Sequence, residues 1–240
     1  MVRKIVVIAA LALSGACAGD QRPPADAADR PDPVARQTPD ARRVVLFLGT
    51  SLTAGYGLAI EQAFPSVVAE VIDSAGLPYR VVNAGVSGET SAGGLRRIDW
   101  LLSEPVDVLV LELGANDGLR GLDVDEMRRN LQEIVDRTRA RYPHARIVIA
   151  GMESPPNMGS RYTSAFRRVF PDLAAANDAA LIPFLLDGVA GRPELNQLDG
   201  IHPTAEGHRR IAATVWQVLE PLLRDPVLIG ALFPPSPERA

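Results

Sequence analysis

The residues of this chain that could do chemistry together are a serine, a histidine, an aspartate, an asparagine and two glycines. A serine hydroxyl is a weak nucleophile until a neutral imidazole accepts its proton, and an aspartate can fix the tautomer of that imidazole. An asparagine amide and backbone N–H groups beside glycine can bind the oxyanion that then forms. This set favours acyl transfer through a covalent intermediate. Its members are Ser51 in "LFLGTSLTAGYGL", Gly85 and Gly88 in "NAGVSGET", Asn116 in "GAND", and Asp199 and His202 in "LDGIHP".

Each of these residues has an expected role. We expect Ser51 to be the nucleophile and His202 to be its base, because an imidazole titrates near physiological pH. Asp199 stands three residues before His202 and can reach the other ring nitrogen. The oxyanion would be bound by the side-chain amide of Asn116 and by the backbone N–H groups of Gly85 and Ser51, since glycine lets the main chain approach a substrate closely.

Each residue also has a simpler explanation. A lone serine such as Ser51 is more often a helix-capping residue than a nucleophile. His202, which precedes a proline, could simply open the last helix. Asn116 could lie in a turn, and Gly85 and Gly88 could be ordinary turn residues of a loop. No single residue is specific, but all of them occur in this order, each after an expected strand, and that joint pattern favours the acyl-transfer interpretation.

The sequence lacks the motifs that several other kinds of chemistry require. The sequence around Ser51 does not fit G-x-S-x-G, and no G-x-x-x-x-G-K-[ST] is present, so neither an α/β-hydrolase elbow nor a nucleotide P-loop is indicated. We expect His144 and His208 at the surface, and no second ligand stands at metal spacing from any histidine, so no metal or other cofactor is expected. Interspersed charges with a formal net charge of -4 argue against a nucleic-acid partner.

The elements that must position these residues are predicted from the hydrophobic pattern. Five continuous apolar runs have the length of strands buried on both faces, and helical patterns alternate with them. This order predicts an α/β protein, a three-layer α/β/α sandwich with a five-stranded parallel sheet. Ligands bind such folds beyond the carboxyl ends of the strands, so the residues above should converge at one edge. The expected strands are 44–48, 79–82, 106–113, 146–150 and 181–185, and the expected helices are 64–75, 91–103, 123–141, 161–179 and 204–223.

Length and composition predict one folded domain, which we place at residues 43–225. The chain has 240 residues, 47% of them hydrophobic, which is enough for one full-sized core. Residues 18–42 are rich in Pro, Ala, Asp and Arg and predict a disordered tether. Residues 226–240 form a C-terminal tail whose apolar run is expected to pack on the domain or to fray. We expect the domain to be a monomer.

The first 17 residues predict a signal peptide. Arg3 and Lys4 precede an apolar run, residues 5–13, that is too short to span a bilayer, and small residues follow it. Cys17, the sole cysteine, stands in "SGAC", which resembles a bacterial lipoprotein box, although ordinary cleavage nearby is the alternative. We therefore expect export to the periplasm, with Cys17 as a candidate site of lipidation and membrane association. No disulfide can form within the domain.

Four blocks of the sequence together resemble those of the SGNH (GDSL-type) serine hydrolases. They are "GTSLTAGYG", "NAGVSGET", "LELGANDGLRG" and "DGIHP", and the resemblance extends from about residue 44 to 224. The runs "ELGANDGLRG", "RYTSAFRRVFPDLA" and "LIPFLL" resemble the periplasmic branch known as acyl-thioesterase, lysophospholipase or arylesterase. The resemblance implies a flavodoxin-like fold, Ser51 as nucleophile, His202 as base, Asp199 as its partner, and an oxyanion hole of Ser51, Gly85 and Asn116.

One position departs from that resemblance. The first block of these hydrolases usually reads Gly-Asp-Ser, whereas this chain has Gly49-Thr50-Ser51. The missing Asp is not the acid of the triad, so the assignment of the nucleophile stands. Thr50 cannot supply the same charge or accept as many hydrogen bonds, so we expect altered support for the serine loop, with a changed pH optimum or rate.

The expected activity is hydrolysis of carboxylic esters or thioesters through an acyl-enzyme on Ser51. A small ester, a lysophospholipid or an acyl thioester would be the substrate. Met152, Pro155 and Met158 lie in the loop "GMESPPNMGSRY" and could provide apolar contacts for an acyl chain, or could simply pack that loop.

Two alternatives remain. Carbohydrate O-acetylesterases use a similar fold, but aromatic residues make up only 5% of the chain, which leaves few rings to stack on sugars. A catalytically inactive, lipid-anchored binding protein is disfavoured because the set of serine, asparagine, aspartate and histidine is complete.

Overall fold

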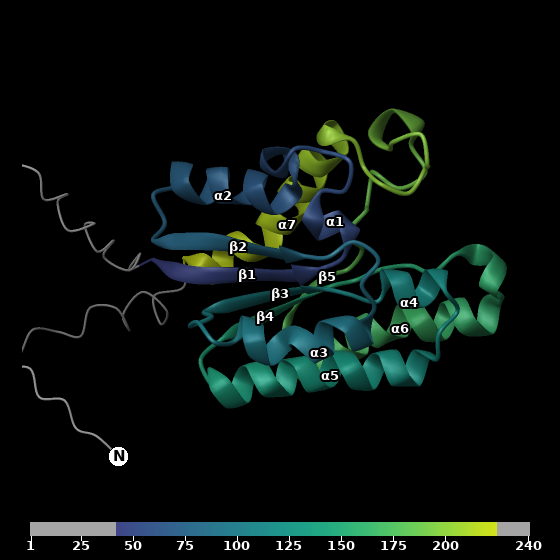
Figure 1. Cartoon of the computed structure of the whole chain (residues 1–240), viewed down its shortest axis with the longest axis horizontal. Coiled ribbons are helices and arrows are strands. Elements are labelled where there is room, and N and C mark those ends of the chain that lie inside the picture. The colour runs from purple at the N-terminus through teal and green to yellow at the C-terminus, as the bar shows by residue number, and fades with distance from the viewer. Residues whose placement is uncertain (1–41, 225–240) are drawn as a thin grey trace, which may run out of the picture. The chain divides into compact units, whose positions relative to one another are not determined.

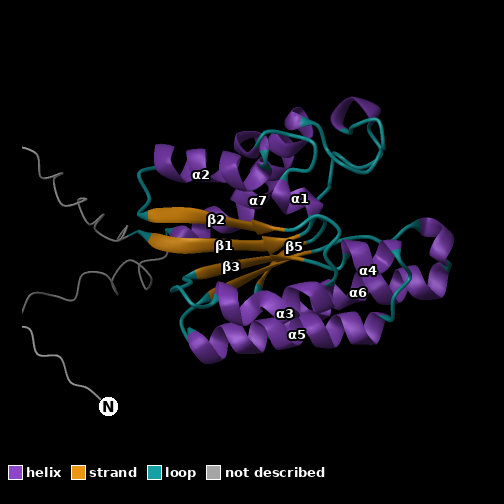
Figure 2. Cartoon of the chain, in the orientation of Figure 1, coloured by secondary structure: helices purple, strands orange, loops and turns teal. Residues whose placement is uncertain are grey.

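Five parallel strands form the middle layer of the structure (Figures 1 and 2), and β1 and β3 are buried along their whole length. The order across the sheet is β2-β1-β3-β4-β5, so the direction of strand addition reverses at β1, between β2 and β3. The carboxyl ends of β1 and β3 therefore border the crevice where ligands bind such sheets. The strands are β1 (Arg43–Gly49), β2 (Tyr79–Gly85), β3 (Val108–Glu112), β4 (Arg146–Ala150) and β5 (Ala180–Ile182).

Helices cover both faces of this sheet. In Figure 1, α1, α2 and α7 lie on one face and α3, α5 and α6 on the other, which confirms the three-layer α/β/α prediction. The helices are α1 (Ser51–Ala54), α2 (Phe64–Ser74), α3 (Ser91–Leu101), α4 (Ala115–Leu119), α5 (Val124–Arg141), α6 (Ser160–Ala176) and α7 (Ala205–Leu223), with short 3₁₀ turns at Ile60–Gln62, Pro156–Met158 and Pro193–Leu195.

The computed structural model describes residues 42–224, which belong to one compact unit. The predicted signal peptide with Cys17, most of the predicted tether and the predicted C-terminal tail lie outside the described residues. Within 42–224, no helix is long and apolar enough to cross a membrane.

The local sequence explains why these elements form. All seven residues of β1 are buried, as a continuous apolar run predicts for a central strand. In α5 the buried side chains recur at helical spacing, and Asp123 caps the helix by accepting a 2.7 Å hydrogen bond from the Glu126 N–H. The helical pattern expected over 123–141 is therefore what the structure contains.

The expected strand over residues 181–185 is shorter than predicted. β5 ends at Ile182 because Pro183 has no N–H to continue the ladder. The next backbone bonds go to Gly151 instead: its N–H donates to the Ile182 carbonyl (2.8 Å), and its carbonyl accepts from the Leu185 N–H (2.9 Å).

His208 is buried, so the prediction of a surface position is wrong for this residue. Its side chain is 1% exposed, and Nδ1 accepts a 3.1 Å hydrogen bond from the Phe64 N–H. The ring stacks on Phe64 with centroids 6.2 Å apart. Burial, aided by the charge of His202, lowers the pKa of His208 to about 4. His208 therefore joins α7 to α2 as a neutral acceptor, while His144 is exposed as expected.

This burial predicts a pH-dependent stability. The pKa of His208 is about 4 in the folded chain and 6.5 when unperturbed, so between these values the unfolded state binds more protons. The free energy of unfolding should then fall by about 3 kcal/mol as the pH drops from 6.5 to 4. His208→Gln keeps an acceptor for Phe64 and should remove this slope, measured by urea unfolding at several pH values. His144→Gln is the control. Equal slopes in the wild type and His208→Gln would contradict the assignment.

Candidate active site

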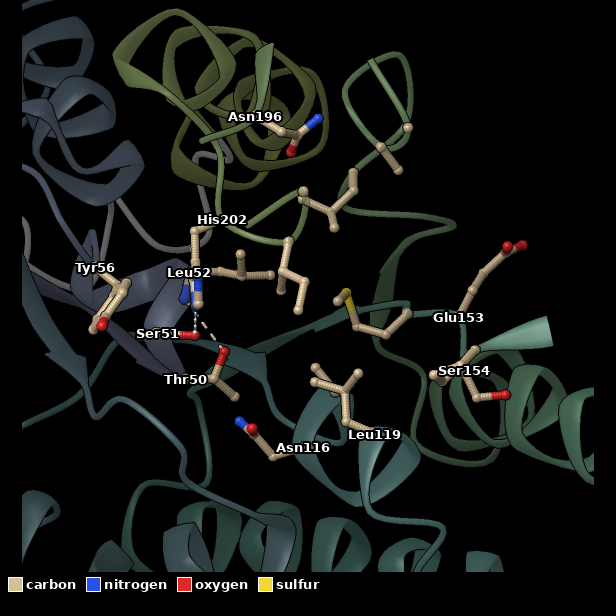
Figure 3. Close-up of a pocket in the computed structure, with 18 of the residues that line it drawn as sticks. Thr50, Ser51, Leu52, Tyr56, Asn116, Leu119, Glu153, Ser154, Asn196 and His202 are labelled. Carbon is tan, nitrogen blue, oxygen red and sulfur yellow. Dashed lines mark hydrogen bonds between the residues drawn. The ribbon is translucent and has the colours of Figure 1, made fainter. Parts of the chain in front are cut away.

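Three segments far apart in the sequence meet at the carboxyl edge of the sheet. Ser51 is the first residue of α1, directly after β1, and Asn116 lies on α4, directly after β3. Asp199 and His202 lie in the loop that leads into α7. Figure 3 shows Ser51, His202 and Asn116 directed toward one another from these segments.

Two hydrogen bonds connect the serine, the histidine and the aspartate. His202 Nε2 lies 3.0 Å from Ser51 Oγ, and His202 Nδ1 lies 2.6 Å from Asp199 Oδ2. The other carboxylate oxygen, Asp199 Oδ1, accepts the backbone N–H groups of Ile201 (2.9 Å) and His202 (3.0 Å). The carboxylate is thus held by its own loop. By binding Nδ1, it orients the imidazole so that Nε2 faces the serine hydroxyl.

Asp199 is ionised at neutral pH. The bond to the His202 ring, followed by the backbone N–H groups of His202 and Ile201, lowers the pKa of Asp199 to about 2. A carboxylate at Nδ1 keeps the hydrogen of a neutral imidazole on that nitrogen. His202 Nε2 is then free to accept the proton of Ser51.

Tyr56 packs against the histidine, a contact that the sequence analysis missed. Its ring centroid lies 4.5 Å from that of His202, and the residue is 51% exposed. Gln197 holds the backbone at this point, because its Nε2 donates to the carbonyls of Tyr56 (2.8 Å) and Pro203 (3.0 Å). Nothing in the pattern around Tyr56 indicates this contact, which arises from two loops that are distant in the sequence.

Asn116 has one amide hydrogen to spare. Its Nδ2 donates to the Glu89 carbonyl at 2.9 Å, which orients the amide and leaves the second hydrogen available. The side chain lines the same cavity as Ser51, and Figure 3 shows its amide facing the serine turn. This arrangement fits a donor to a developing oxyanion.

Gly85 does not face the cavity, which corrects the expectation for this residue. Its N–H donates to Asn83 Oδ1 at 3.0 Å, and an added Cβ would collide with the backbone of Ala54 in α1. Gly85 therefore serves close packing. Gly88 lines the cavity instead, with φ +78, and within residues 42–224 its N–H meets no acceptor. Both glycines occur in "NAGVSGET", so the sequence alone did not distinguish them.

The capping residue of α1 is Thr50, so the alternative that Ser51 is a capping hydroxyl is wrong. Thr50 Oγ1 accepts a 3.4 Å hydrogen bond from the Leu52 N–H. The Ser51 hydroxyl instead faces His202. Thr50 also contacts Glu112, a buried carboxyl that the sequence analysis did not single out.

An apolar cavity of about 530 Å³ extends from the serine. In Figure 3, Ser51 and His202 lie at one end and Glu153 and Ser154 at the other. Of the three loop residues expected to contact substrate, Met152 and Pro155 line the cavity, whereas Met158 does not and packs near Gly121. The larger apolar side chains in the walls include Leu52, Leu119, Met152, Pro155, Pro156, Phe184, Leu186 and Ile201.

No group of three His, Cys, Asp or Glu side chains in the described part of the chain could hold a metal ion. The serine is hydrogen-bonded to a histidine, which is hydrogen-bonded to an aspartate. This set lies at the ligand-binding edge of a parallel sheet and beside an apolar cavity. Such an arrangement defines a serine hydrolase.

Comparison with known proteins agrees with this class. The model of the GDSL-like lipase/acylhydrolase family matches residues 47–210. Esterase TesA of Pseudomonas aeruginosa is 42% identical over 184 residues, which cover 76% of this chain and 90% of that protein. Thioesterase 1/protease 1/lysophospholipase L1 of Escherichia coli K12 is 37% identical over 185 residues, covering 76% and 86%. A crystal structure of TesA matches with a TM-score of 0.71 and 41% identity, covering 75% of this chain and 99% of that one.

The chain belongs to the GDSL-like lipase/acylhydrolase family. It is a hydrolase of carboxylic esters, and the five-stranded α/β/α fold is the fold of its solved relatives.

The hydrogen bonds of Asp199 predict what an amide would do in its place. In Asp199→Asn, the oxygen would stay with the two backbone N–H groups of Ile201 and His202, and the NH₂ group would face His202 Nδ1. Nδ1 would then become an acceptor and Nε2 would carry the hydrogen, so the ring could not take the serine proton. We expect kcat for a p-nitrophenyl ester to fall by roughly 10³–10⁴-fold.

The exposed Asp172 of α6 provides the control, since Asp172→Asn changes the charge equally without touching the site. A folded Asp199→Asn protein with the kcat of the control would show that the carboxylate does not set the tautomer.

Proposed function

We propose that this chain hydrolyses carboxylic esters and thioesters that carry an apolar acyl group, through an acyl-enzyme on Ser51. The observation that carries this proposal is the pair of hydrogen bonds from Ser51 to His202 (3.0 Å) and from His202 to Asp199 (2.6 Å) at one end of an apolar cavity. The relatives named esterase and thioesterase/lysophospholipase support ester and thioester bonds as the bonds that are hydrolysed.

The acylation step uses the three residues in turn. His202 Nε2 takes the proton of Ser51 Oγ as the oxygen attacks the carbonyl carbon. Asp199 remains a carboxylate and stabilises the imidazolium. When the tetrahedral intermediate collapses, His202 gives the proton to the leaving alcohol or thiol. A water molecule then attacks the acyl-enzyme with His202 again as base, which releases the carboxylic acid and restores Ser51.

The oxyanion in both steps would meet three donors. These are the backbone N–H groups of Ser51 and Gly88 and the free hydrogen of Asn116 Nδ2. All three residues line the cavity, and the bond from Asn116 to the Glu89 carbonyl holds the amide in place before the substrate arrives. Each such donor contributes about 3 kcal/mol to lowering the barrier in serine hydrolases.

The acyl group would lie in the cavity beyond Ser51. Its walls are predominantly apolar, and Met152, which is 5% exposed, is one of the buried residues that line it. Tyr56, Leu119 and Ile201 line the cavity and are about half exposed, so its solvent-accessible part is apolar as well. These surfaces suit a hydrocarbon chain or an aryl group, and they offer few polar partners for the hydroxyls of a sugar, which disfavours a carbohydrate O-acetylesterase.

The cellular setting belongs to the same proposal. The signal-peptide pattern of residues 1–17 supports export to the periplasm, and "SGAC" supports a lipid anchor on Cys17. The folded domain would then occupy 43–225 as a monomer, joined by the tether 18–42 to the anchor.

Labelling by a serine-reactive fluorophosphonate tests the nucleophile. The wild type should be labelled and inhibited, and Ser51→Ala should show neither labelling nor measurable ester hydrolysis, because no activated hydroxyl remains. Ser87 lines the same cavity, so Ser87→Ala is a matched control that should still be labelled. Labelling that persists in Ser51→Ala would overturn the proposed mechanism.

The two methionines of the 152–158 loop test the acyl pocket. Met152→Trp fills the cavity, so activity on p-nitrophenyl esters should shift toward short acyl chains, with kcat/KM for the longer chains falling about 10-fold or more. Met158→Trp changes the same loop outside the cavity and should leave the chain-length profile unchanged. Identical profiles for the two variants would place the acyl group elsewhere.

A further inference from the structure

A buried carboxyl group lies directly beneath the serine turn. Glu112, the last residue of β3, is 0% exposed. Its Oε2 accepts the backbone N–H groups of Thr50 (2.8 Å) and Thr53 (3.3 Å) and the hydroxyl of Thr53 (2.8 Å). The hydroxyl of Thr50 lies 3.0 Å from both carboxyl oxygens. Four donors therefore converge on one side chain, and they come from the two residues that flank the turn containing Ser51.

We propose that Glu112 is a positioning residue for the nucleophile, which fixes Ser51 by binding both ends of the turn from Thr50 to Thr53. This inference rests on the proposed role of Ser51. The only side-chain bond of Ser51 among the described residues is the one to His202. Its carbonyl accepts backbone N–H groups of Gly55 and Tyr56, but both belong to the segment just after the turn and do not tie the serine to the sheet. The position of Ser51 is set by its neighbours.

The opposite side of the same turn is held from β2. Asn83 Nδ2 donates to the Thr53 carbonyl at 2.8 Å. The turn is thus bound from β3 through Glu112 and from β2 through Asn83. Gly49 makes the close approach possible, because an added Cβ there would lie 2.5 Å from Glu112 Oε2.

Thr50 gives this arrangement a particular chemistry. Its hydroxyl donates to Glu112 and accepts from the Leu52 N–H, so it links the carboxyl to the start of α1. An aspartate at this position, as in the related Gly-Asp-Ser blocks, would place a second carboxyl within hydrogen-bond distance of the first. Two carboxylates so close cannot both ionise. With Thr50, Glu112 is the sole acid of the cluster.

Both protonation states of Glu112 can keep these bonds. Burial raises the pKa of Glu112 to about 7, against the lowering effect of the bonds from Thr50 and Thr53. When neutral, Oε1–H can donate to Thr50 Oγ1, whose own hydrogen turns to Oε2. A glutamine reproduces that pattern, with its NH₂ at the place of Oε1. Glutamine is therefore the conservative variant and leucine the disruptive one.

The neighbouring titratable groups have other partners. Asp117 of α4 accepts the N–H (2.8 Å) and the hydroxyl (2.6 Å) of Ser91. His202 contacts Ser51 on the cavity side of the turn, and its ring is bound to Asp199. Within residues 42–224, only Thr50 and Thr53 donate to Glu112, so its effect on the turn is exerted through these two residues.

The test compares Glu112→Gln with Glu112→Leu by kcat and KM on one p-nitrophenyl ester and by the rate of fluorophosphonate labelling. Glu112→Gln should keep kcat within about 3-fold of the wild type. Glu112→Leu leaves four buried donors without an acceptor, so the turn should shift and kcat and the labelling rate should fall by about 100-fold with KM nearly unchanged. Wild-type kcat in a folded Glu112→Leu protein would overturn the proposal.

If Glu112→Leu does not fold, the proposal can be tested by comparing valine substitutions at two buried threonines, Thr53 and Thr138. Thr53→Val removes one hydroxyl donor to Glu112 and should lower kcat about 10-fold, with recovery in Thr53→Ser. Thr138→Val is matched, since Thr138 is equally buried and its hydroxyl donates to the Ile134 carbonyl at 2.8 Å in α5. Equal kcat in the two valine variants would overturn the positioning role.

The Ser51→Ala labelling test has a separate outcome. If Ser51→Ala were still labelled, the assignment of the nucleophile would be wrong, whereas the comparison of the two valine variants tests only whether Thr53 and Glu112 affect kcat.

Discussion

The active site depends on how closely the serine turn can approach the sheet. Gly49, the last residue of β1, pairs in register with Gly85 of β2 on one side and with Glu112 of β3 on the other. Side chains at either glycine would collide with the turn or with the carboxyl group beneath it. Because both positions lack a Cβ, α1 packs directly on the strand ends, and Ser51 reaches the edge where His202 arrives from the loop before α7.

Two acidic side chains near the serine have opposite environments. Asp199 is bound by the His202 ring and two backbone N–H groups in a partly exposed loop, which lowers its pKa to about 2. Glu112 lies beneath the turn, where burial raises its pKa to about 7. The exposed acid keeps its charge and serves the imidazole, whereas the buried acid meets only neutral donors and organises the backbone. Environment, rather than residue type, separates the two functions.

Much of the fold could be predicted because buried parallel strands and amphipathic helices leave regular patterns. The run 44–48 and the spacing of apolar residues in 123–141 correspond to β1 and α5. Candidate residues for the site also followed from their places after strands, and the structure brings Ser51, His202 and Asp199 within hydrogen-bond distance. Where prediction was wrong, as for the length of β5 and the burial of His208, a tertiary contact or a missing N–H overrode the local pattern.

The sequence by itself determined the order of the elements and which residues could form a serine, histidine and aspartate set, because hydrophobic period and position after a strand are local properties. Only the tertiary structure decided that Gly88 rather than Gly85 faces the cavity, that Met152 lines it and Met158 does not, and that Glu112 lies beneath Thr50. These outcomes depend on strand register and on the path of loops, which bring together residues as far apart as Thr50 and Glu112. A local sequence pattern does not predict contacts between residues so far apart in the chain.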